Sequence, residues 1–273
     1  MPFTPSHAVI ALPFVRTPLV PAAIAIGAMT PDLPLFLRGM GLPYGFTHSP
    51  VNVVWTTLVA FVLFVVWRVV LRPGLVALSP DAVASRMPDE WRHTGRRAAV
   101  DAVGPGERPG RPLLLVLSLM IGVLSHIVWD LFTHEGRWGV ETFPVLGEMW
   151  GPLLGYKWLQ YGSSVAGLLI VGGYALLWLR RRPVQARPRR LPSWLRWAWL
   201  LALPAMLIIA WMIGLAVYGP ITLGFTVQHL AYRVLPAACG LWGAMTMLLC
   251  VGIVLVSERD RARRSEDSRS ALR

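Results

Sequence analysis

Three ionisable side chains recur at helical spacing within one apolar stretch. His126, Asp130 and His134 occupy positions i, i+4 and i+8, so a helix would place them on one face. Ionisable groups inside a membrane helix are costly and usually face the protein interior, where they pair or serve a function. The spacing therefore indicates a buried polar site, although a His-x-x-x-Asp pattern has little specificity by itself.

Side chains of the same chemical kind precede the first long apolar stretch, at His7, Asp32 and His48. Imidazoles and carboxylates are the ligands of a zinc-type site, which in enzymes keeps one position open for water. Such an ion lowers the pKa of the bound water and polarises an ester or phosphoryl oxygen. We therefore expect His7, Asp32, His48, His126 and Asp130 to ligate a divalent metal, for which zinc is the first choice.

Structural explanations compete with a metal site. A His–Asp pair one turn apart can be a hydrogen bond between two buried polar groups, or a proton relay. His93 is interpreted as a solvated loop histidine and His229 as an interfacial residue. If a metal activates water, His134 or Glu135 is the candidate general base, and the competing interpretation of Glu135 is a solvated loop acid.

Composition decides what kind of protein must position these residues. The chain has 273 residues, of which 55% are hydrophobic and 15% charged, and its mean hydropathy is +0.55. Soluble proteins carry about 25% charged residues, so the composition excludes an ordinary soluble domain and favours a multi-span membrane protein. Cys239 and Cys250 lie eleven residues apart, about 16 Å on a helix, which is too far for a disulfide.

Five stretches are long and apolar enough to cross a bilayer, which takes about 20 residues. They are Val51–Leu71, Pro112–Phe132, Gly162–Leu179, Trp194–Val217 and Leu235–Val256. Residues from Pro73 to Arg111 are expected to form a flexible or partly helical cytoplasmic loop. We predict a single integral membrane domain over residues 1–257 and a charged cytoplasmic tail over residues 258–273.

The basic residues predict the orientation of the spans. Of the 26 Lys and Arg, 21 lie in Arg68–Arg111, Arg180–Arg196 and the tail from Arg259, and five lie in the intervening segments. The positive-inside rule places the rich side in the cytoplasm, so the N-terminus is expected outside the plasma membrane. The net charge of +12 then reflects topology, and a nucleic-acid partner is not expected.

The first 50 residues hold two apolar stretches that are too short to span, Ala8–Pro13 and Leu19–Met29. Eleven helical residues measure about 16 Å, roughly half of the hydrocarbon core. We expect a broken or re-entrant helical hairpin, with a sixth, broken span as the alternative. No signal peptide is expected, because no basic segment precedes an apolar core. The predicted fold is an all-α polytopic bundle of five full spans plus this hairpin.

Four short motifs resemble those of a known family. They are MPFTPSHA at the N-terminus, GAMTPD ending at Asp32, FTHS around His48, and SHIVWDLFTHEG from Ser125. Together they resemble the bacterial membrane family called domain of unknown function 4184, over nearly the whole chain.

A more distant similarity is to the membrane-bound metal-dependent hydrolases. Their shared motifs are an N-terminal Thr/Ser-His, a Pro-Asp after a small-residue helix, a Thr-His-Ser, and a His-x-x-x-Asp in a later span. This resemblance implies a metal site built from His7, Asp32, His48, His126 and Asp130.

The chain departs from the hydrolase-like pattern in two places. Leu33 and Pro34 follow Asp32 where those families often have Pro-Asp-x-Asp. Pro43 and Tyr44 stand at positions where those families often have His-Arg. Either one metal of a two-metal site is missing, or His134 replaces the lost ligand.

These observations predict a multi-span membrane protein that acts as a metal-dependent hydrolase on a phosphoester or ester at the outer membrane face. The bilayer and a lipid or cell-envelope substrate are the expected partners. The alternative is a non-catalytic protein, such as a small transporter or an assembly factor, whose His/Asp cluster binds an ion or holds helices together. Convergence of the ligands beside an outward-opening cleft would favour the enzyme, and a continuous polar path through the spans would favour transport.

Overall fold

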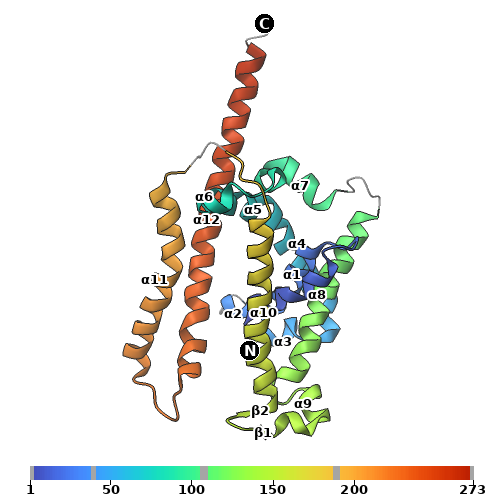
Figure 1. The fold of residues 1–273 in the computed structure, drawn as a ribbon, viewed down its shortest axis with the longest axis vertical. Helices are drawn as coiled ribbons and strands as arrows, with labels where there is room; N and C mark the ends of the chain where they lie inside the picture. The colour runs from blue at the N-terminus through green and yellow to red at the C-terminus, as the bar shows by residue number, and fades with distance from the viewer. Residues whose placement is uncertain (1–2, 38–40, 105–109, 187–190, 271–273) are drawn as a thin grey trace. The chain divides into compact units, whose positions relative to one another are not determined.

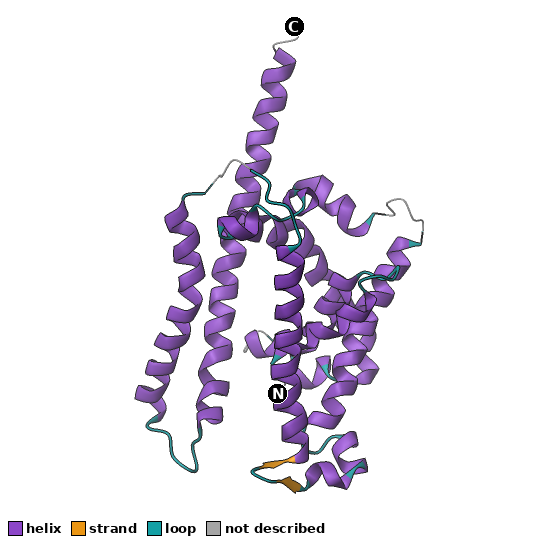
Figure 2. Ribbon diagram, viewed as in Figure 1, coloured by secondary structure: helices purple, strands orange, loops and turns teal. Residues whose placement is uncertain are grey.

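The computed structural model describes residues 3–37, 41–104, 110–186 and 191–270. Most of the described chain is helical (Figures 1 and 2), and loops and one ribbon of two short strands, β1 (Met149–Trp150) and β2 (Leu153–Leu154), connect the helices. The helices form two compact units. Unit 1 takes the described residues within 1–34, 40–64 and 103–181, and unit 2 those within 35–39, 65–102 and 182–273.

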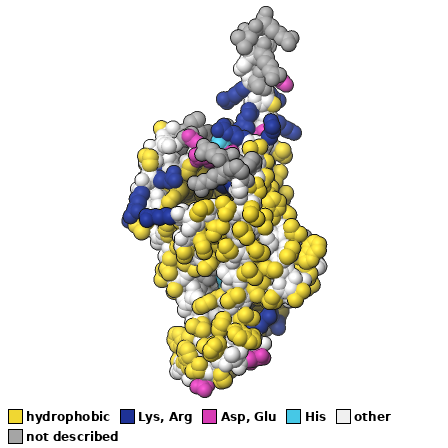
Figure 3. Space-filling model, turned by 90° about the vertical axis from the view of Figure 1, so that its right-hand side faces the viewer, with side chains coloured by type: hydrophobic (Ala, Val, Ile, Leu, Met, Phe, Trp, Pro, Cys, Tyr) yellow, Lys and Arg dark blue, Asp and Glu magenta, His cyan; other side chains and the backbone are white. Residues whose placement is uncertain are grey.

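Five of the described helices are long and apolar enough to cross a membrane. The first runs from Pro50 to Leu78 through η3 (Pro50–Asn52), α4 (Val53–Val66), the π-helical turn η4 (Trp67–Leu71) and α5 (Arg72–Leu78). The others are α8 (Arg111–Thr133), α10 (Gly155–Arg180), α11 (Ser193–Tyr218) and α12 (Val227–Ser270). These confirm the predicted all-α bundle of five spans. Hydrophobic side chains predominate on the face drawn in Figure 3, as contact with lipid requires.

The first span extends beyond its predicted end at Leu71 because the helix continues through Arg72 and Pro73. Pro73 lies in the first turn of α5, where a missing N–H is tolerated. The Arg72 side chain is buried, and its guanidinium donates to the Glu90 carbonyl oxygen at 2.6 Å. A charge that would have ended the span is therefore held by a hydrogen bond inside the protein.

In unit 1 the N-terminal residues form the expected helical hairpin. The 3₁₀ helix η1 (Thr4–Phe14) packs against α1 (Pro21–Met29), and α1 packs against α8. Neither short helix is among the five membrane-length helices. Gly27 of α1 and Gly122 of α8 meet where the two helices cross, and a β-carbon on either would overlap the backbone of the other helix. Two glycines thus bring α1 and α8 into backbone contact.

Short elements complete unit 1. The 3₁₀ turn η2 (Thr30–Asp32) ends α1, α2 (Leu33–Phe36) follows it, and α3 (Tyr44–Thr47) precedes the first span. Between α8 and α10 lie α9 (Trp138–Thr142), η6 (Pro144–Gly147) and the two strands. A small core of Val140, Leu146 and Tyr156 packs this connection together.

The part of the predicted loop Pro73–Arg111 that belongs to unit 2, residues 73–102, is partly helical, with α6 (Asp81–Ala84), η5 (Asp89–Arg92) and most of α7 (Gly95–Val103). Residues 105–109 of that loop lie outside the described residues. Two contacts tie the loop to later membrane-length helices of this unit. Arg196 of α11 forms an ion pair with Asp81, and Thr94 donates to Glu258 of α12. The charged segment that follows the first span is therefore tied to two other spans.

His93 differs from its interpretation as a solvated histidine, because its Nδ1 is hydrogen-bonded to Asp101. α11 and α12 form an antiparallel pair in which Trp199 and Trp242 stack at 5.4 Å between ring centroids. α12 continues without a break past residue 258 to Ser270, so the described part of the tail is helical.

Candidate metal centre

Four ligand-type atoms of unit 1 converge on one point. The two imidazole nitrogens, His48 Nε2 and His126 Nε2, lie 3.2 Å apart. Asp130 Oδ2 is 3.5 Å from each of them, and Asp32 Oδ1 is 3.7 Å from each. All four residues are buried, with at most 4% of their surface exposed. The structure thus brings these four residues together from three separate segments of the chain.

Hydrogen bonds on the far side of each imidazole determine what the facing nitrogens can do. His126 Nδ1 lies 2.7 Å from the Ala28 carbonyl oxygen, and His48 Nδ1 lies 3.0 Å from the Tyr44 carbonyl oxygen. A carbonyl only accepts, so both Nδ1 atoms must carry the proton and donate it. In the neutral rings both Nε2 atoms then present lone pairs to each other. Two acceptors at this distance repel unless a cation lies between them.

Local structure explains how each ligand reaches this point. Asp32 ends the 3₁₀ turn that follows α1. In α1 itself, the Ala28 carbonyl oxygen accepts the hydrogen bond from His126 Nδ1. His126 stands one helical turn after Gly122, the residue at which α8 crosses α1. His48 follows α3, and Thr47 Oγ1 donates to the Pro31 carbonyl oxygen at 2.7 Å. That bond fixes the His48 segment beside the Asp32 turn.

Three buried ligand-type atoms have no hydrogen-bond partner among the described residues: His7 Nε2, Asp32 Oδ1 and Asp130 Oδ1. Buried polar atoms without partners are rare in proteins and call for an explanation. Burial lowers the pKa of His7 to about 3, so its imidazole is neutral at physiological pH. Burial also raises the pKa of Asp32 above its usual value, because the carboxylate has little water to stabilise its charge.

His7 reaches the centre from η1. Its ring stacks on that of His126, with centroids 4.0 Å apart. His7, Asp32 and His126 form a second group whose ligand atoms lie within 4.8 Å of one another, beside the group of His48, His126 and Asp130. Each residue expected to ligate a metal is therefore found in one of these two overlapping groups.

The two residues expected as general bases lie outside both groups. His134 Nδ1 is 3.3 Å from the Asp130 backbone oxygen and 3.6 Å from Asp130 Oδ2. Its other nitrogen accepts a hydrogen bond of 3.3 Å from Gln160. Burial lowers the pKa of His134. Glu135 is exposed and accepts a hydrogen bond of 3.3 Å from Tyr156.

Two further residues, Thr4 and Tyr44, contact the cluster and were not expected from the sequence. Thr4 Oγ1 donates to Asp32 Oδ2 at 2.7 Å. Tyr44 stacks on His48 with centroids 3.7 Å apart, and its hydroxyl is 3.5 Å from Asp130 Oδ2. The four-residue spacing of Tyr44 and His48, one helical turn, is the sequence feature that could have predicted their stacking. For the contact of Thr4 with Asp32, the only sequence signal was the position of Thr4 in the N-terminal motif.

A cleft of about 300 Å³ opens beside His7, between η1, α8 and α10. Its walls are largely apolar and include Val9, Ile10, Trp129 and Ile170. Trp129 is 39% exposed and Ile170 is 52% exposed. The cleft therefore joins the His7 side of the cluster to a surface formed by two membrane-length helices.

Comparison with known proteins places the chain in a family. No curated protein and no solved structure matches it. The family model described as "Domain of unknown function (DUF4184)" matches residues 1–257. Because that match covers nearly all of the chain, the protein belongs to the DUF4184 family.

Proposed function

We propose that His48, His126, Asp32 and Asp130 bind one divalent metal ion, with His7 beside it. The observation that carries this proposal is the pair of imidazole lone pairs facing each other at 3.2 Å, flanked by two buried carboxylates. A shared cation turns this repulsive arrangement into an attractive one. It also gives the buried carboxylates the positive partner that burial demands.

The distances support a small ion. In a tetrahedral zinc site with bonds of about 2.0–2.1 Å, neighbouring ligand atoms lie about 3.3–3.4 Å apart. The separations of 3.2–3.7 Å agree with that value after a small adjustment. A set of imidazoles and carboxylates without thiolates favours zinc, manganese or a similar ion over copper(I).

The chemistry we propose is hydrolysis of a phosphoester or ester. A metal of this kind acts by lowering the pKa of a bound water and by polarising the oxygen of the scissile group. We assign His7 to the side of the metal at which water and substrate bind, because its buried Nε2 is unpartnered among the described residues and its ring is neutral. His134 acts as a positioning residue, because it contacts Asp130. Glu135 has no role in this proposal.

The cleft supports an amphiphilic substrate. Its apolar walls and its opening onto membrane-length helices suit an acyl chain, while the metal holds the ester or phosphoester group. From the distribution of basic residues we infer that this cluster lies toward the outer face of the plasma membrane, with the C-terminus in the cytoplasm. A lipid or lipid-linked envelope molecule is therefore the substrate class we propose.

Metal content of the full chain in detergent tests the metal site. After removal of metals with a chelator and reloading with zinc, the wild type should retain zinc through gel filtration. His126→Ala and Asp32→Ala should lose most of it, whereas His229→Ala, which alters an exposed histidine, should retain it. Equal zinc in the wild type and His126→Ala would refute the site.

A second measurement separates the enzyme from the non-catalytic alternative. Zinc-loaded protein should release nitrophenol from nitrophenyl esters or phosphates of long-chain type, and His126→Ala should not. Retention of zinc without hydrolysis of either class would favour the alternative, in which the ion holds α1, α3 and α8 together. That alternative has its own support, because the four ligands come from segments far apart in sequence.

A further inference from the structure

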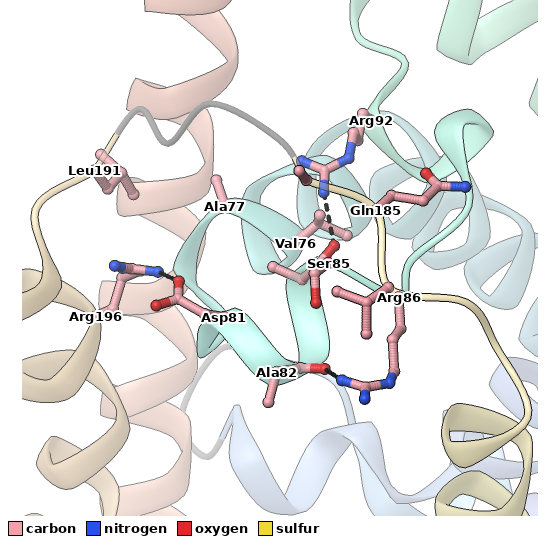
Figure 4. A pocket seen from close by; sticks show the side chains of 13 residues that line it. Val76, Ala77, Asp81, Ala82, Ser85, Arg86, Arg92, Gln185, Leu191 and Arg196 are labelled. Carbon is pink, nitrogen blue, oxygen red and sulfur yellow. Dashed lines mark hydrogen bonds and ion pairs between the residues drawn. The ribbon is translucent and has the colours of Figure 1, made fainter.

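Unit 2 contains a second pocket, with a volume of about 510 Å³. It lies between the end of α5, α6, the chain around Gln185 and the start of α11 (Figure 4). All of its lining residues belong to unit 2. None of them belongs to the candidate metal centre, so an inference about this pocket is independent of the proposed function.

Three arginines from separate elements line the pocket: Arg86 after α6, Arg92 of η5 and Arg196 of α11. Asp81 is the single acid among its described lining residues, which leaves a formal charge of +2. Arg196 is 7% exposed and paired with Asp81, yet its Nε is buried without a hydrogen-bond partner among the described residues. Buried arginine donors of this kind favour an anionic ligand.

Backbone contacts hold two of these guanidinium groups in place. Arg86 donates to the Ala82 carbonyl oxygen at 2.6 Å, and Arg92 donates to the Ala84 carbonyl oxygen at 2.7 Å. A guanidinium carries five N–H donors in a planar fork, so one bond to a carbonyl orients the group and leaves other donors of Arg86 for a ligand. Figure 4 shows Arg92 and Arg196 on two sides of α6.

We propose that this pocket binds a phosphate monoester. Such a group carries about −1.5 to −2 charges at pH 7, which matches the excess charge of the lining. Its oxygens suit the donor geometry of arginine. Apolar side chains, including Val76, Val184 and Leu191, form much of the remaining wall and provide room for an uncharged organic part. The same group occurs in soluble phosphate esters and in the headgroup of phosphatidic acid.

Binding to the purified full chain in detergent tests this proposal. The probes are glycerol 3-phosphate, short-chain phosphatidic acid and short-chain phosphatidylcholine, measured by calorimetry or native mass spectrometry. We expect at least one of the two phosphate monoesters to bind, and phosphatidylcholine, a diester with a neutral headgroup, not to bind. Binding of glycerol 3-phosphate identifies a soluble ligand, and binding of phosphatidic acid alone identifies a lipid headgroup; both support the site.

Variants locate the binding. Arg86→Gln should weaken it about tenfold or more, as expected for the loss of a charge-assisted hydrogen bond. Arg96→Gln, an exposed arginine of α7 that does not line the pocket, should bind as the wild type does. The double variant Asp81→Asn/Arg196→Gln avoids an unpaired buried charge and should also weaken binding. Binding of neither monoester, or equal binding by Arg86→Gln and Arg96→Gln, would overturn the proposal.

Discussion

Gly122 lies against the backbone of α1, one helical turn before His126. A β-carbon at this glycine would overlap the Ile24 carbonyl oxygen and approach the Ala28 nitrogen to 2.7 Å. The Ala28 carbonyl is the group that orients the His126 ring. The distance between the two helices and the direction of the His126 Nε2 lone pair are therefore set at one crossing.

Replacing this glycine should damage the centre without touching a ligand. Gly122→Val must separate α1 from α8, and overpacking of this kind costs about 1–3 kcal/mol. We expect a lower melting temperature in detergent and loss of bound zinc. Gly172→Val on α10, where a β-carbon meets nothing within 4 Å, is the matched control. Full zinc binding by Gly122→Val would contradict the coupling between the crossing and the site.

Thr4 should act on the metal through Asp32. Its hydroxyl holds the second carboxylate oxygen of Asp32 at 2.7 Å, and loss of such a supporting hydrogen bond typically weakens metal binding 10–100-fold. Thr4→Val should show this loss in a zinc titration, and Thr4→Ser should restore most of the affinity. Thr17→Val, in the exposed connection after η1, serves as the control. If Thr4→Val and Thr17→Val bind zinc equally, Thr4 has no positioning role.

The cleft can be blocked without changing the ligands. Ala166 of α10 lines it, so the bulky side chain of Ala166→Trp should fill it. We expect unchanged zinc content, with hydrolysis of long-chain esters reduced more than that of short-chain esters. Ala175→Trp places the same side chain on the exposed surface of α10, outside the cleft. Equal loss for both chain lengths would remove the cleft as the acyl-chain site.

The His93–Asp101 pair of unit 2 predicts that the stability of the protein depends on pH. The hydrogen bond from His93 holds the pKa of Asp101 below its usual value. A depressed carboxyl pKa adds stability that is full above the unfolded pKa, about 3.9, and is lost as the pH falls through the folded pKa. The wild type should therefore melt above Asp101→Asn at pH 6, and the gap should narrow below pH 4. Asp260→Asn, on the exposed surface of α12, should show no such gap; a gap for Asp101→Asn that is constant with pH would refute the assignment.

The charge distribution predicts an orientation of the chain in the membrane that cysteine labelling can test. In a background with Cys239 and Cys250 replaced by alanine, an impermeant maleimide should label Val145→Cys in intact cells but not His93→Cys. Val145 is 50% exposed on the connection between α8 and α10. The reverse pattern of labelling would place the N-terminus in the cytoplasm.

The residues of the cluster were predictable because ionisable side chains are rare inside membrane segments. His126 and Asp130 share one helix face, and Asp32 and His48 stand out among apolar neighbours. The surrounding contacts were not predictable in the same way. Thr4 is one of many hydroxyl residues, and the partner of His134 is Gln160, 26 residues further along. The general-base assignments relied on side-chain type, whereas the contacts of His134 and Glu135 depend on how α8 and α10 pack.

The end of the first span was also mispredicted because it depends on a contact between residues far apart in sequence. Arg72 and Pro73 were sufficient reason to end a helix at Leu71, because a charge and a proline each disfavour its continuation. The Glu90 carbonyl that receives the Arg72 guanidinium lies 18 residues away. A hydropathy pattern contains no information about that contact.

The two overlapping groups of ligand-type residues share His126. This shared residue predicts how many metal ions one chain can bind. His126 commits its Nδ1 proton to the Ala28 carbonyl, so Nε2 offers a single lone pair. One lone pair serves one ion, and an ion held by His126 with His48 and Asp130 excludes a second ion held by His126 with His7 and Asp32. Zinc titration should therefore saturate at one equivalent per chain, as a mononuclear centre requires.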